Sequence, residues 1–448
     1  MSAATSRESL PFHLLGNFAP VPDEATLTEL RVEGAIPREL SGLYVRTGPN
    51  PKSGTSGHWF LGDGMVHGVR LEGGRARWYR NRYVQTQSLA NPDAQRVSET
   101  GQIDRRLSKA NTHVLAHAGK IWALEEGSFP YLLDRELNTT GCTDFGGKLT
   151  SAFTAHPKRC PTTGELLGFG YGQFPPYFTY QRVSKAGELV QSEVIDMKGP
   201  TMIHDFAITE SRVVILDLPV VFDLEAALRG TMPFHWSDDY GARIGIMPRS
   251  GGNADVRWFE IDPCYVFHTV NAYDEGDRVV LDASRYESLW RDSGDFASNG
   301  KQDVRRWELD LRSGAVRESV LDDRATEFPR VADARVGQKH RFSYLTLWDT
   351  TDPGSAAVHQ LLKMDLATGK SEVHDFGPSR HPGEPVFVPA AGSQADDEGY
   401  VITYVYDDAT NTSDLVILDA SRLAAKPIAT VKIPRRIPYG FHGSWMAD

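Results

Sequence analysis

The sequence lacks the features that mark membrane-spanning, secreted and disulfide-stabilised proteins. No segment reaches the roughly 18 consecutive apolar residues of a membrane-spanning helix, and residues 1–20 lack the apolar core of a signal peptide. The three cysteines are odd in number, and none belongs to a Cys-x-x-Cys pair of the kind that binds zinc. We therefore expect a cytoplasmic protein whose cysteines are reduced.

Basic residues and nucleotide-binding loops are also scarce. The net charge is −11 and the pI is near 5.7, which argues against nucleic acid as a partner because phosphate binding needs clustered Lys and Arg. Gly369-Lys370-Ser371 lacks the upstream glycine of a phosphate loop. The glycine-rich segment 168–172 precedes no evident helix, so it is not a dinucleotide-binding loop. We expect neither a nucleic-acid partner nor an organic cofactor.

Helical periodicity is rare as well, and residues 223–230 are its best example. Short β-branched and aromatic stretches separated by turns predict hairpins, as in residues 113–126 and 400–419. A similar strand-and-turn element recurs around Asp310, Asp365 and Asp419, at intervals of 55 and 54 residues. That period is typical of a β-propeller blade, and a β-sandwich is the alternative. We expect one all-β domain over residues 1–448, in which residues 1–30 form an N-terminal arm.

The residues that suggest chemistry are four of the 14 histidines and three glutamates. A histidine taken at random is usually structural, but each of these adjoins an apolar or aromatic strand-like segment. Glutamates beside such segments are costly to bury without a partner. Successive intervals along the series are 30, 48, 64, 59, 57 and 58 residues, close to one position per blade of a seven-bladed ring; the members are Glu126, His156, His204, His268, Glu327, Glu384 and His442.

Four neutral imidazoles on a six-coordinate metal leave two positions open for other ligands. A metal-bound imidazole usually donates its second N–H to a carboxylate or a carbonyl, and the three glutamates are suited to that role. They would also offset the charge of a divalent metal. Spacing does not identify the metal, because imidazole also suits zinc, copper and nickel.

The chain resembles the carotenoid cleavage oxygenases, a family that includes apocarotenoid oxygenases, stilbene-cleaving dioxygenases and the retinal-pigment-epithelium isomerohydrolase. Besides the His and Glu motifs, the matching segments are residues 36–51, 58–69 and 110–115. The resemblance implies a seven-bladed propeller capped by a dome of loops and short helices, with a hydrophobic tunnel that leads to iron(II) on the axis. It implies that the iron ligands are His156, His204, His268 and His442, that the glutamates support three of them, and that His156 lacks such support. Thr112 matches a position near an open iron site in some members.

These features predict an iron(II)-dependent dioxygenase that splits an alkene of a carotenoid, an apocarotenoid or a related conjugated compound into two carbonyl products. Phe60 and Phe267 are expected to contact the substrate near the metal. Stilbene cleavage is the alternative reaction, but Glu125 stands where phenol-binding stilbene cleavers of the family carry lysine. A non-catalytic metal-binding propeller is the alternative outside enzymology, and the sequence leaves the oligomeric state open.

Two other features have less direct interpretations. The pairs His58 and His67, and His113 and His117, resemble metal pairs, but we interpret them as structural because further ligands are missing.

Residues 220–236 carry six large apolar side chains that suit either weak contact with a membrane surface or ordinary packing. The interspersed Asp223, Glu225 and Arg229 favour packing.

Overall fold

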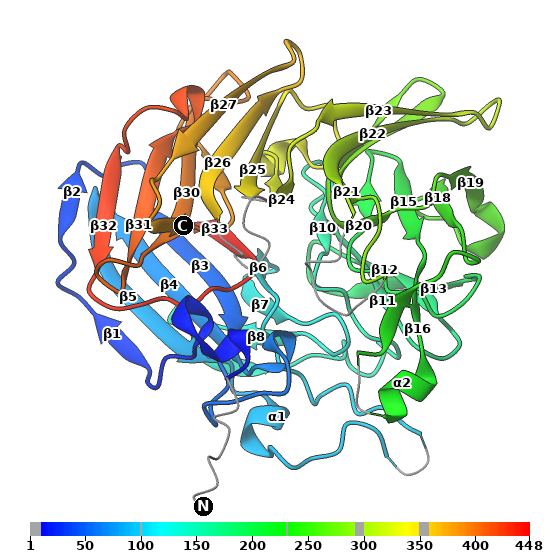
Figure 1. Ribbon diagram of the computed structural model, residues 1–448, viewed down its shortest axis with the longest axis horizontal. Coiled ribbons are helices and arrows are strands. Elements are labelled where there is room, and N and C mark those ends of the chain that lie inside the picture. Colours follow the sequence, from blue (N-terminus) through cyan, green and yellow to red (C-terminus); the bar gives the residue numbers. More distant parts are fainter. Residues whose placement is uncertain (1–9, 99–100, 230–231, 292–299, 349–357) are drawn as a thin grey trace, which may run out of the picture.

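The structure, a computed structural model, describes residues 10–98, 101–229, 232–291, 300–348 and 358–448. Within these residues, seven β-sheets of four to six strands stand as blades around a common centre (Figure 1). The prediction of an all-β, seven-bladed propeller is therefore confirmed, and the β-sandwich alternative is wrong. A separate two-stranded hairpin is formed by β16 (Val220–Phe222) and β17 (Phe234–Trp236).

We number the blades in chain order. Blades 1 to 3 consist of the following strands: β1 (Ala25–Leu27), β3 (Gly42–Pro49), β4 (Gly64–Glu72), β5 (Arg75–Tyr83) and β33 (Gly443–Ala447) in blade 1; β6 (His113–His117), β7 (Lys120–Leu124), β8 (Tyr131–Leu133) and β9 (Thr139–Cys142) in blade 2; β10 (Lys158–Arg159), β11 (Leu166–Tyr171), β12 (Phe178–Val183) and β13 (Leu189–Ile195) in blade 3.

Blades 4 to 7 follow the same antiparallel plan. Their strands are β14 (Ala207–Ile208), β15 (Arg212–Asp217), β18 (Ala242–Pro248) and β19 (Arg257–Ile261) in blade 4; β20 (Tyr265–Glu275), β21 (Arg278–Tyr286), β22 (Gln302–Asp310) and β23 (Val316–Asp322) in blade 5; β24 (Thr326–Arg330), β25 (Phe342–Trp348), β26 (Val358–Asp365) and β27 (Lys370–Asp375) in blade 6; β28 (Arg380–Pro382), β29 (Val386–Pro389), β30 (Gly399–Asp407), β31 (Thr412–Asp419), β32 (Ala429–Ile433) and β2 (Val32–Gly34) in blade 7.

The two ends of the described chain close the ring together. Strand β33 pairs with β3 in blade 1, so that Met446 lies opposite Leu43 and Gly443 lies opposite Arg46. Strand β2 pairs with β32 in blade 7. Of the expected N-terminal arm, residues 1–9 lie outside the described residues, and residues 25–27 form the outer strand β1 on blade 1. Blades 1 and 7 therefore combine strands from both ends of the chain.

The predicted repeat corresponds to one element of three blades. Asp310, Asp365 and Asp419 each end the third strand of a blade, in β22, β26 and β31. Each side chain accepts a hydrogen bond from the backbone N–H two residues later, at 2.9, 3.1 and 2.9 Å respectively. Because this bond mimics a backbone turn, aspartate suits the point where the chain reverses into the outer strand.

The predicted hairpins and helix are also present. Strands β6 and β7 are joined by Ala118 and Gly119, whose φ angles of 49° and 73° both lie in the left-handed region that the favoured two-residue turn requires. Strands β30 and β31 form the hairpin expected over residues 400–419. Helix α2 (Leu224–Leu228) begins after Asp223, whose side chain accepts from the Ala226 N–H at 3.1 Å.

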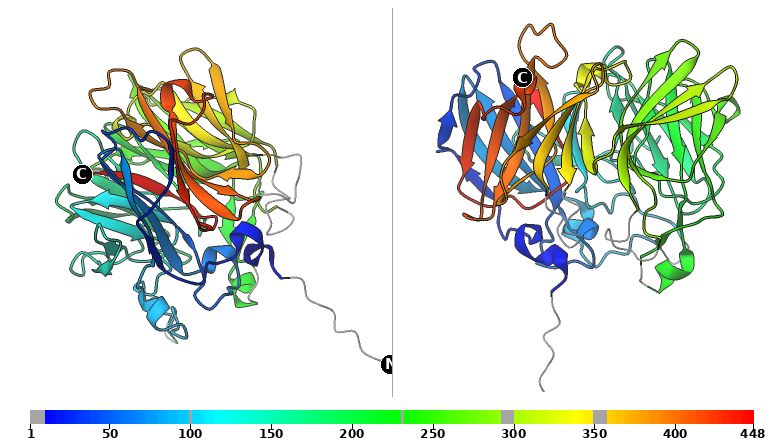
Figure 2. Two further views of the ribbon diagram at one scale, coloured as in Figure 1. Left: turned by 90° about the vertical axis from the view of Figure 1, so that its left-hand side faces the viewer. Right: turned by 45° about the horizontal axis from the view of Figure 1, so that its top comes forward.

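Helices α1 (Gln87–Ala90) and α2 and the first 3-10 turns lie below the blades in the right-hand view of Figure 2. No helix of the described residues is long and apolar enough to cross a membrane. In the segment 220–236, Leu224 and Leu228 are exposed and Trp236 is buried, while residues 230 and 231 lie outside the described residues. The 3-10 turns are η1 (Phe12–Leu14), η2 (Gly16–Phe18), η3 (Trp59–Leu61), η4 (Asn253–Asp255), η6 (Asp333–Arg335) and η7 (Ala420–Arg422).

Apolar side chains fill the spaces between neighbouring blades. Phe169 and Phe178 of blade 3 stack with ring centroids 5.1 Å apart, and Phe206, just before blade 4, packs edge-on against Phe169 at 5.2 Å. All three rings are fully buried. Because no blade can cover both of its faces, these contacts hold the ring together.

We expect Phe169→Ala to lower the free energy of unfolding by about 3–5 kcal/mol, because it removes a fully buried ring and leaves a cavity between two blades. Phe174→Ala, at a phenylalanine that is 58% exposed, should change it by less than about 0.5 kcal/mol. Denaturant unfolding measures both. Equal effects of the two substitutions would contradict the assigned core.

Candidate metal centre

The propeller brings four histidines from four blades to one point. His156 lies just before β10, His204 just before β14, His268 within β20 and His442 just before β33. One nitrogen from each lies within 4.8 Å of the others, a grouping that could hold a metal ion. Each residue stands at or next to the innermost strand of its blade. The predicted set of four is therefore assembled in space, although His156 and His442 are 286 positions apart in the sequence.

The distances within the set suit shared coordination. The Nε2 atoms of His156 and His204 are 3.0 Å apart, and those of His268 and His442 are 3.1 Å apart. Two nitrogens bound at right angles to one ion, each at about 2.1 Å, are separated by about 3.0 Å. The residues present thus fit a transition metal with imidazole ligands.

The protonation states of the histidines also favour a bound metal. Burial, followed by the neighbouring imidazoles, holds the pKa values of His156 and His442 well below the ordinary range. Burial also lowers the pKa of His204, but Glu126, together with Asp205 and Glu327, outweighs burial, so the net shift of the pKa is upward. Neutral imidazoles with facing lone pairs repel one another unless a cation lies between them.

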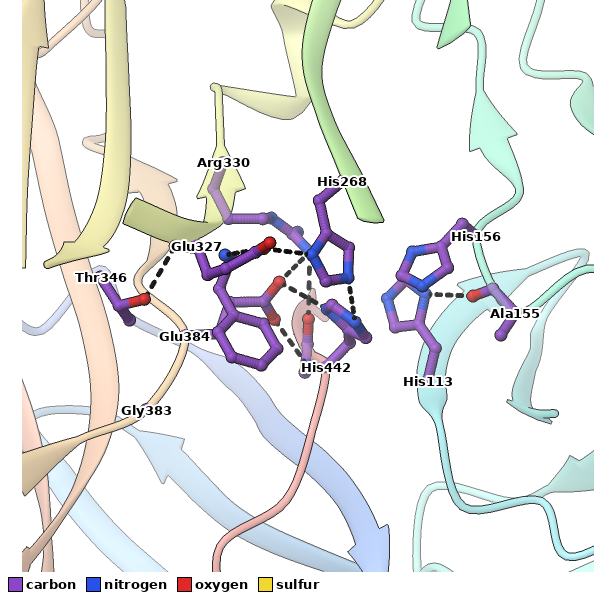
Figure 3. Close-up of polar contacts among 12 residues, drawn as sticks. His113, Ala155, His156, His268, Glu327, Arg330, Thr346, Gly383, Glu384 and His442 are labelled. Carbon is purple, nitrogen blue, oxygen red and sulfur yellow. Dashed lines mark hydrogen bonds and ion pairs between the residues drawn. The ribbon is translucent and has the colours of Figure 1, made fainter. Parts of the chain in front are cut away.

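A glutamate stands behind three of the four imidazoles. Nδ1 of His204 lies 2.7 Å from Glu126, Nδ1 of His268 lies 2.5 Å from Glu327, and Nδ1 of His442 lies 2.9 Å from Glu384. When Nδ1–H donates to the carboxylate, the Nε2 lone pair must face the centre. In Figure 3, Glu327 and Glu384 lie on one side of His268 and His442, and His156 lies on the other.

The seven positions of the sequence series fall in or beside seven different blades. Six lie at or next to the innermost strands of their blades, as the regular spacing suggested. Glu126 differs because it follows β7, the second strand of blade 2. The reversal at Ala118–Gly119 brings the chain back toward the axis, which explains the short interval of 30 residues before His156.

Among the described residues, no carboxylate contacts the ring of His156. Its backbone N–H donates to the Thr154 hydroxyl at 2.9 Å, and its ring lies 4.4 Å from the ring of His442, centroid to centroid. The orientation of His156 therefore depends on how its loop is held.

Strand irregularities aim two of the side chains inward. The pairing of β20 with β21 shifts on both sides of Thr269, next to His268, and the pairing of β24 with β25 shifts between Glu327 and Arg330. Within the second shift, Phe328 has a φ of 51°, an uncommon angle for a bulky residue. Such bulges redirect side chains, and strained backbone of this kind is concentrated at functional sites.

The sequence motifs do not indicate several residues that support the glutamates and histidines of the centre. The Tyr171 hydroxyl donates to Glu126 at 2.8 Å. Arg330 approaches Glu384 at 3.5 Å, and the Gly443 N–H donates to the second oxygen of Glu384 at 2.8 Å. Phe328 stacks on His268 with ring centroids 5.4 Å apart. Tyr171 lies in the Gly-rich segment 168–172, which we tested only as a nucleotide-binding loop. Arg330 follows Glu327 by three residues, and this proximity is the one signal that could have indicated a charged partner for the glutamates.

The other predicted site residues lie close to the histidines. Phe267 is buried and packs edge-on against His204 at 5.5 Å. The Phe60 ring packs against Phe441, which precedes His442, at 5.7 Å. The Thr112 carbonyl accepts from the His442 N–H at 3.1 Å, so Thr112 adjoins the fourth ligand through its backbone. These positions agree with the predicted roles, which stay predictions.

The histidines interpreted as structural lie outside the group of four. Nδ1 of His67 lies 2.9 Å from the Tyr79 hydroxyl, Nε2 of His117 lies 2.8 Å from the Ser184 carbonyl, and His58 accepts from the Phe60 N–H. His113 is nearer than expected, with its ring 5.3 Å from that of His442. Burial lowers the pKa of His113 to about 3, and its Nδ1 lies 2.8 Å from the Ala155 carbonyl.

Comparison with known proteins gives the family. The family model of the retinal pigment epithelial membrane protein matches residues 18–447. A carotenoid cleavage oxygenase of Mycobacterium tuberculosis is 39% identical, over 99% of both chains. The chain belongs to the carotenoid oxygenase family. The carotenoid 9,10(9',10')-cleavage dioxygenase 1 of Arabidopsis thaliana is 36% identical, over 98% of this chain and 91% of the relative.

Among solved structures, the lignostilbene dioxygenase of Pseudomonas brassicacearum superposes with a TM-score of 0.88 at 31% identity, over 98% of this chain and all of the other. Membership in this family, together with the four-histidine centre, makes the protein a dioxygenase of the alkene-cleaving class.

We expect Glu126→Gln to weaken binding of a divalent metal by about 10- to 100-fold, because it removes the negative charge that polarises His204. Glu165→Gln is the control, since Glu165 is similarly exposed and pairs with Arg182 of β12 in blade 3. Competition with a metal indicator measures both. The assigned support would be wrong if the two variants bound metal equally well.

Proposed function

We propose that the protein is an iron(II)-dependent dioxygenase that splits a C=C bond of a carotenoid or an apocarotenoid into two carbonyl groups. The observation that carries this proposal is the group of four inward-facing histidines, three of them backed by glutamate. Four neutral ligands on a six-coordinate ion leave two positions open. When bound, iron(II) supplies the redox chemistry that lets dioxygen react with an alkene.

The charges of the surrounding residues suit a divalent ion. Glu126, Glu327 and Glu384 contribute three negative charges, and Arg330, beside Glu384, contributes one positive charge. Their net charge of −2 balances a divalent cation, which supports a site that holds the ferrous state. A trivalent ion would leave one positive charge uncompensated in a buried site.

The apolar surroundings suit an extended hydrocarbon substrate. Phe267 and Phe328 pack against His204 and His268, so aromatic faces lie beside two of the proposed ligands. These rings can exclude water and position a double bond by contact alone, since an alkene offers no polar group to bind. The C=C bond is broken, and each of its carbons forms a C=O bond with one oxygen atom of O2.

Glu125 favours carotenoids over phenolic stilbenes. Its carboxylate lies 3.3 Å from Arg96 and accepts from the Ser128 hydroxyl at 2.7 Å and from the Lys109 N–H at 3.1 Å. Burial raises the pKa of Glu125, but Arg96 and the hydrogen bonds outweigh it and hold the pKa below its ordinary value. This ionised side chain is fully engaged in anchoring loops, so it offers no donor to a phenolate.

We expect His204→Ala to lose both bound iron and turnover, because three imidazoles hold the ion less tightly and in a different geometry. His374→Ala is the control: it removes a buried histidine of β27 in blade 6 whose ring contacts the Leu423 carbonyl. This variant should keep both its bound iron and its turnover. Iron per chain and product formation are measured on the same preparations. Full activity in an iron-free His204→Ala protein would refute the metal assignment and favour a non-catalytic role for the histidines.

In a substrate panel, carotenoids or apocarotenoids should yield aldehyde or ketone fragments, while 4-hydroxystilbenes should react at least about tenfold more slowly. Product mass after reaction under 18O2 identifies the bond cleaved and shows whether each carbonyl carries a labelled oxygen. A preference for hydroxystilbenes would overturn the substrate proposal, and undiminished cleavage without dioxygen would overturn the oxygenase assignment.

A further inference from the structure

Asp205 directly follows the ligand residue His204, and its carboxylate is almost completely buried, with 1% of the side chain exposed. One oxygen accepts from Lys158 Nζ at 2.7 Å and from the Phe206 N–H at 2.8 Å. The other accepts from the Thr269 N–H and from the Thr269 hydroxyl, both at 2.8 Å. Each oxygen therefore has two donors, which is the number a buried carboxylate needs to be satisfied.

The three residues that meet here belong to three consecutive blades. Lys158 begins β10 of blade 3 and lies two residues after His156. Asp205 precedes β14 of blade 4, and Thr269 lies in β20 of blade 5, directly after His268. One carboxylate thus connects the backbone segments that carry three of the four proposed metal ligands.

The contact with Thr269 coincides with the irregularity that aims His268 at the axis. The pairing of β20 with β21 shifts on both sides of Thr269. A bulge frees backbone N–H groups from the ladder, and a buried N–H needs another acceptor. Asp205 supplies that acceptor, so it stabilises the local geometry from which His268 projects.

The link to Lys158 is important because His156 has no carboxylate behind its ring among the described residues. Its orientation must come from its backbone, which is held on one side by Thr154 and on the other by the Lys158 pair. The remaining ligand, His442, is held separately by Glu384 and by the closing strand.

We propose that Asp205 is a positioning residue of the metal centre: through Lys158 and Thr269 it sets the mutual placement of His156, His204 and His268. This inference rests on the proposed metal site and concerns geometry across blades, beyond the support that each glutamate gives to one ring. The competing interpretation is a generic ion pair that only stabilises the propeller. Removing one partner of any buried pair destabilises a protein, so stability alone does not distinguish the two.

The test uses the full chain, stripped of metal and titrated with Co2+ alone, because the visible absorption of Co2+ reports ligand geometry. We expect Asp205→Asn to weaken Co2+ binding at least about tenfold and to shift the absorption bands, as loss of outer support does at other metal sites. The control is Asp414→Asn. Asp414 is also buried, and it pairs with Arg380 at 2.6 Å and with Lys432 at 2.9 Å in blade 7. This variant should lose thermal stability but bind Co2+ with the wild-type affinity and spectrum.

Wild-type Co2+ affinity and spectrum in Asp205→Asn would show that the pair is only structural, whatever stability is lost. If Asp205→Asn does not fold, Thr269→Val decides, because it keeps both charges and removes one donor. A few-fold weaker affinity with shifted bands supports the proposal, and unchanged binding overturns it. Lys158→Arg, which keeps the cation, should bind more tightly than Lys158→Met. Failure of the wild-type chain to bind Co2+ would instead overturn the metal site itself.

Discussion

The organisation of this protein depends on one requirement, which is that four imidazoles must present unprotonated nitrogens to one buried point. Such an arrangement is unfavourable without a cation, and each ring needs an acceptor behind Nδ1 to direct its lone pair inward. Glu126, Glu327 and Glu384 meet that need for three rings. A propeller suits the requirement because the innermost strands of all blades surround one axis, so residues far apart in the chain can meet there.

The strand pairing that closes the propeller ring also brings the fourth proposed ligand, His442, into the site. His442 immediately precedes β33, and the pairing of β33 with β3 completes blade 1. The backbone N–H of His442 donates to Thr112, and the N–H of Gly443 donates to Glu384, so the closing segment is tied to blades 2 and 7 as it enters blade 1. A metal that holds His442 therefore also holds the closed ring, and loss of closure would remove a ligand.

Each of the three glutamates behind the ligands is itself held by a different kind of group. Tyr171, a neutral donor, holds Glu126; Arg330, a cation, lies beside Glu384; and the backbone N–H of Phe328 donates to Glu327. These differences set the charge of the site, because within the described residues a cation accompanies only one of the three carboxylates. Asp205 and Lys158 form a further ion pair that adds no net charge and joins blades 3 and 4, and Asp205 also accepts hydrogen bonds from Thr269 of blade 5.

The sequence alone indicated an all-β propeller, through the spacing of Asp310, Asp365 and Asp419, with a β-sandwich as the alternative. One chemically suitable residue per blade singled out the seven residues of the centre, and the resemblance to the carotenoid cleavage oxygenases supplied their roles as ligands and supports. It also separated His58, His67 and His117 from the ligands, since none had further partners. Only the tertiary structure revealed Tyr171, Phe328, Arg330, Asp205 and the nearness of His113. The physical reason is that a blade period can be read along the chain, whereas contacts between blades depend on bulges, register shifts and loop paths. Those features arise when the blades pack, and no local pattern of residues records them.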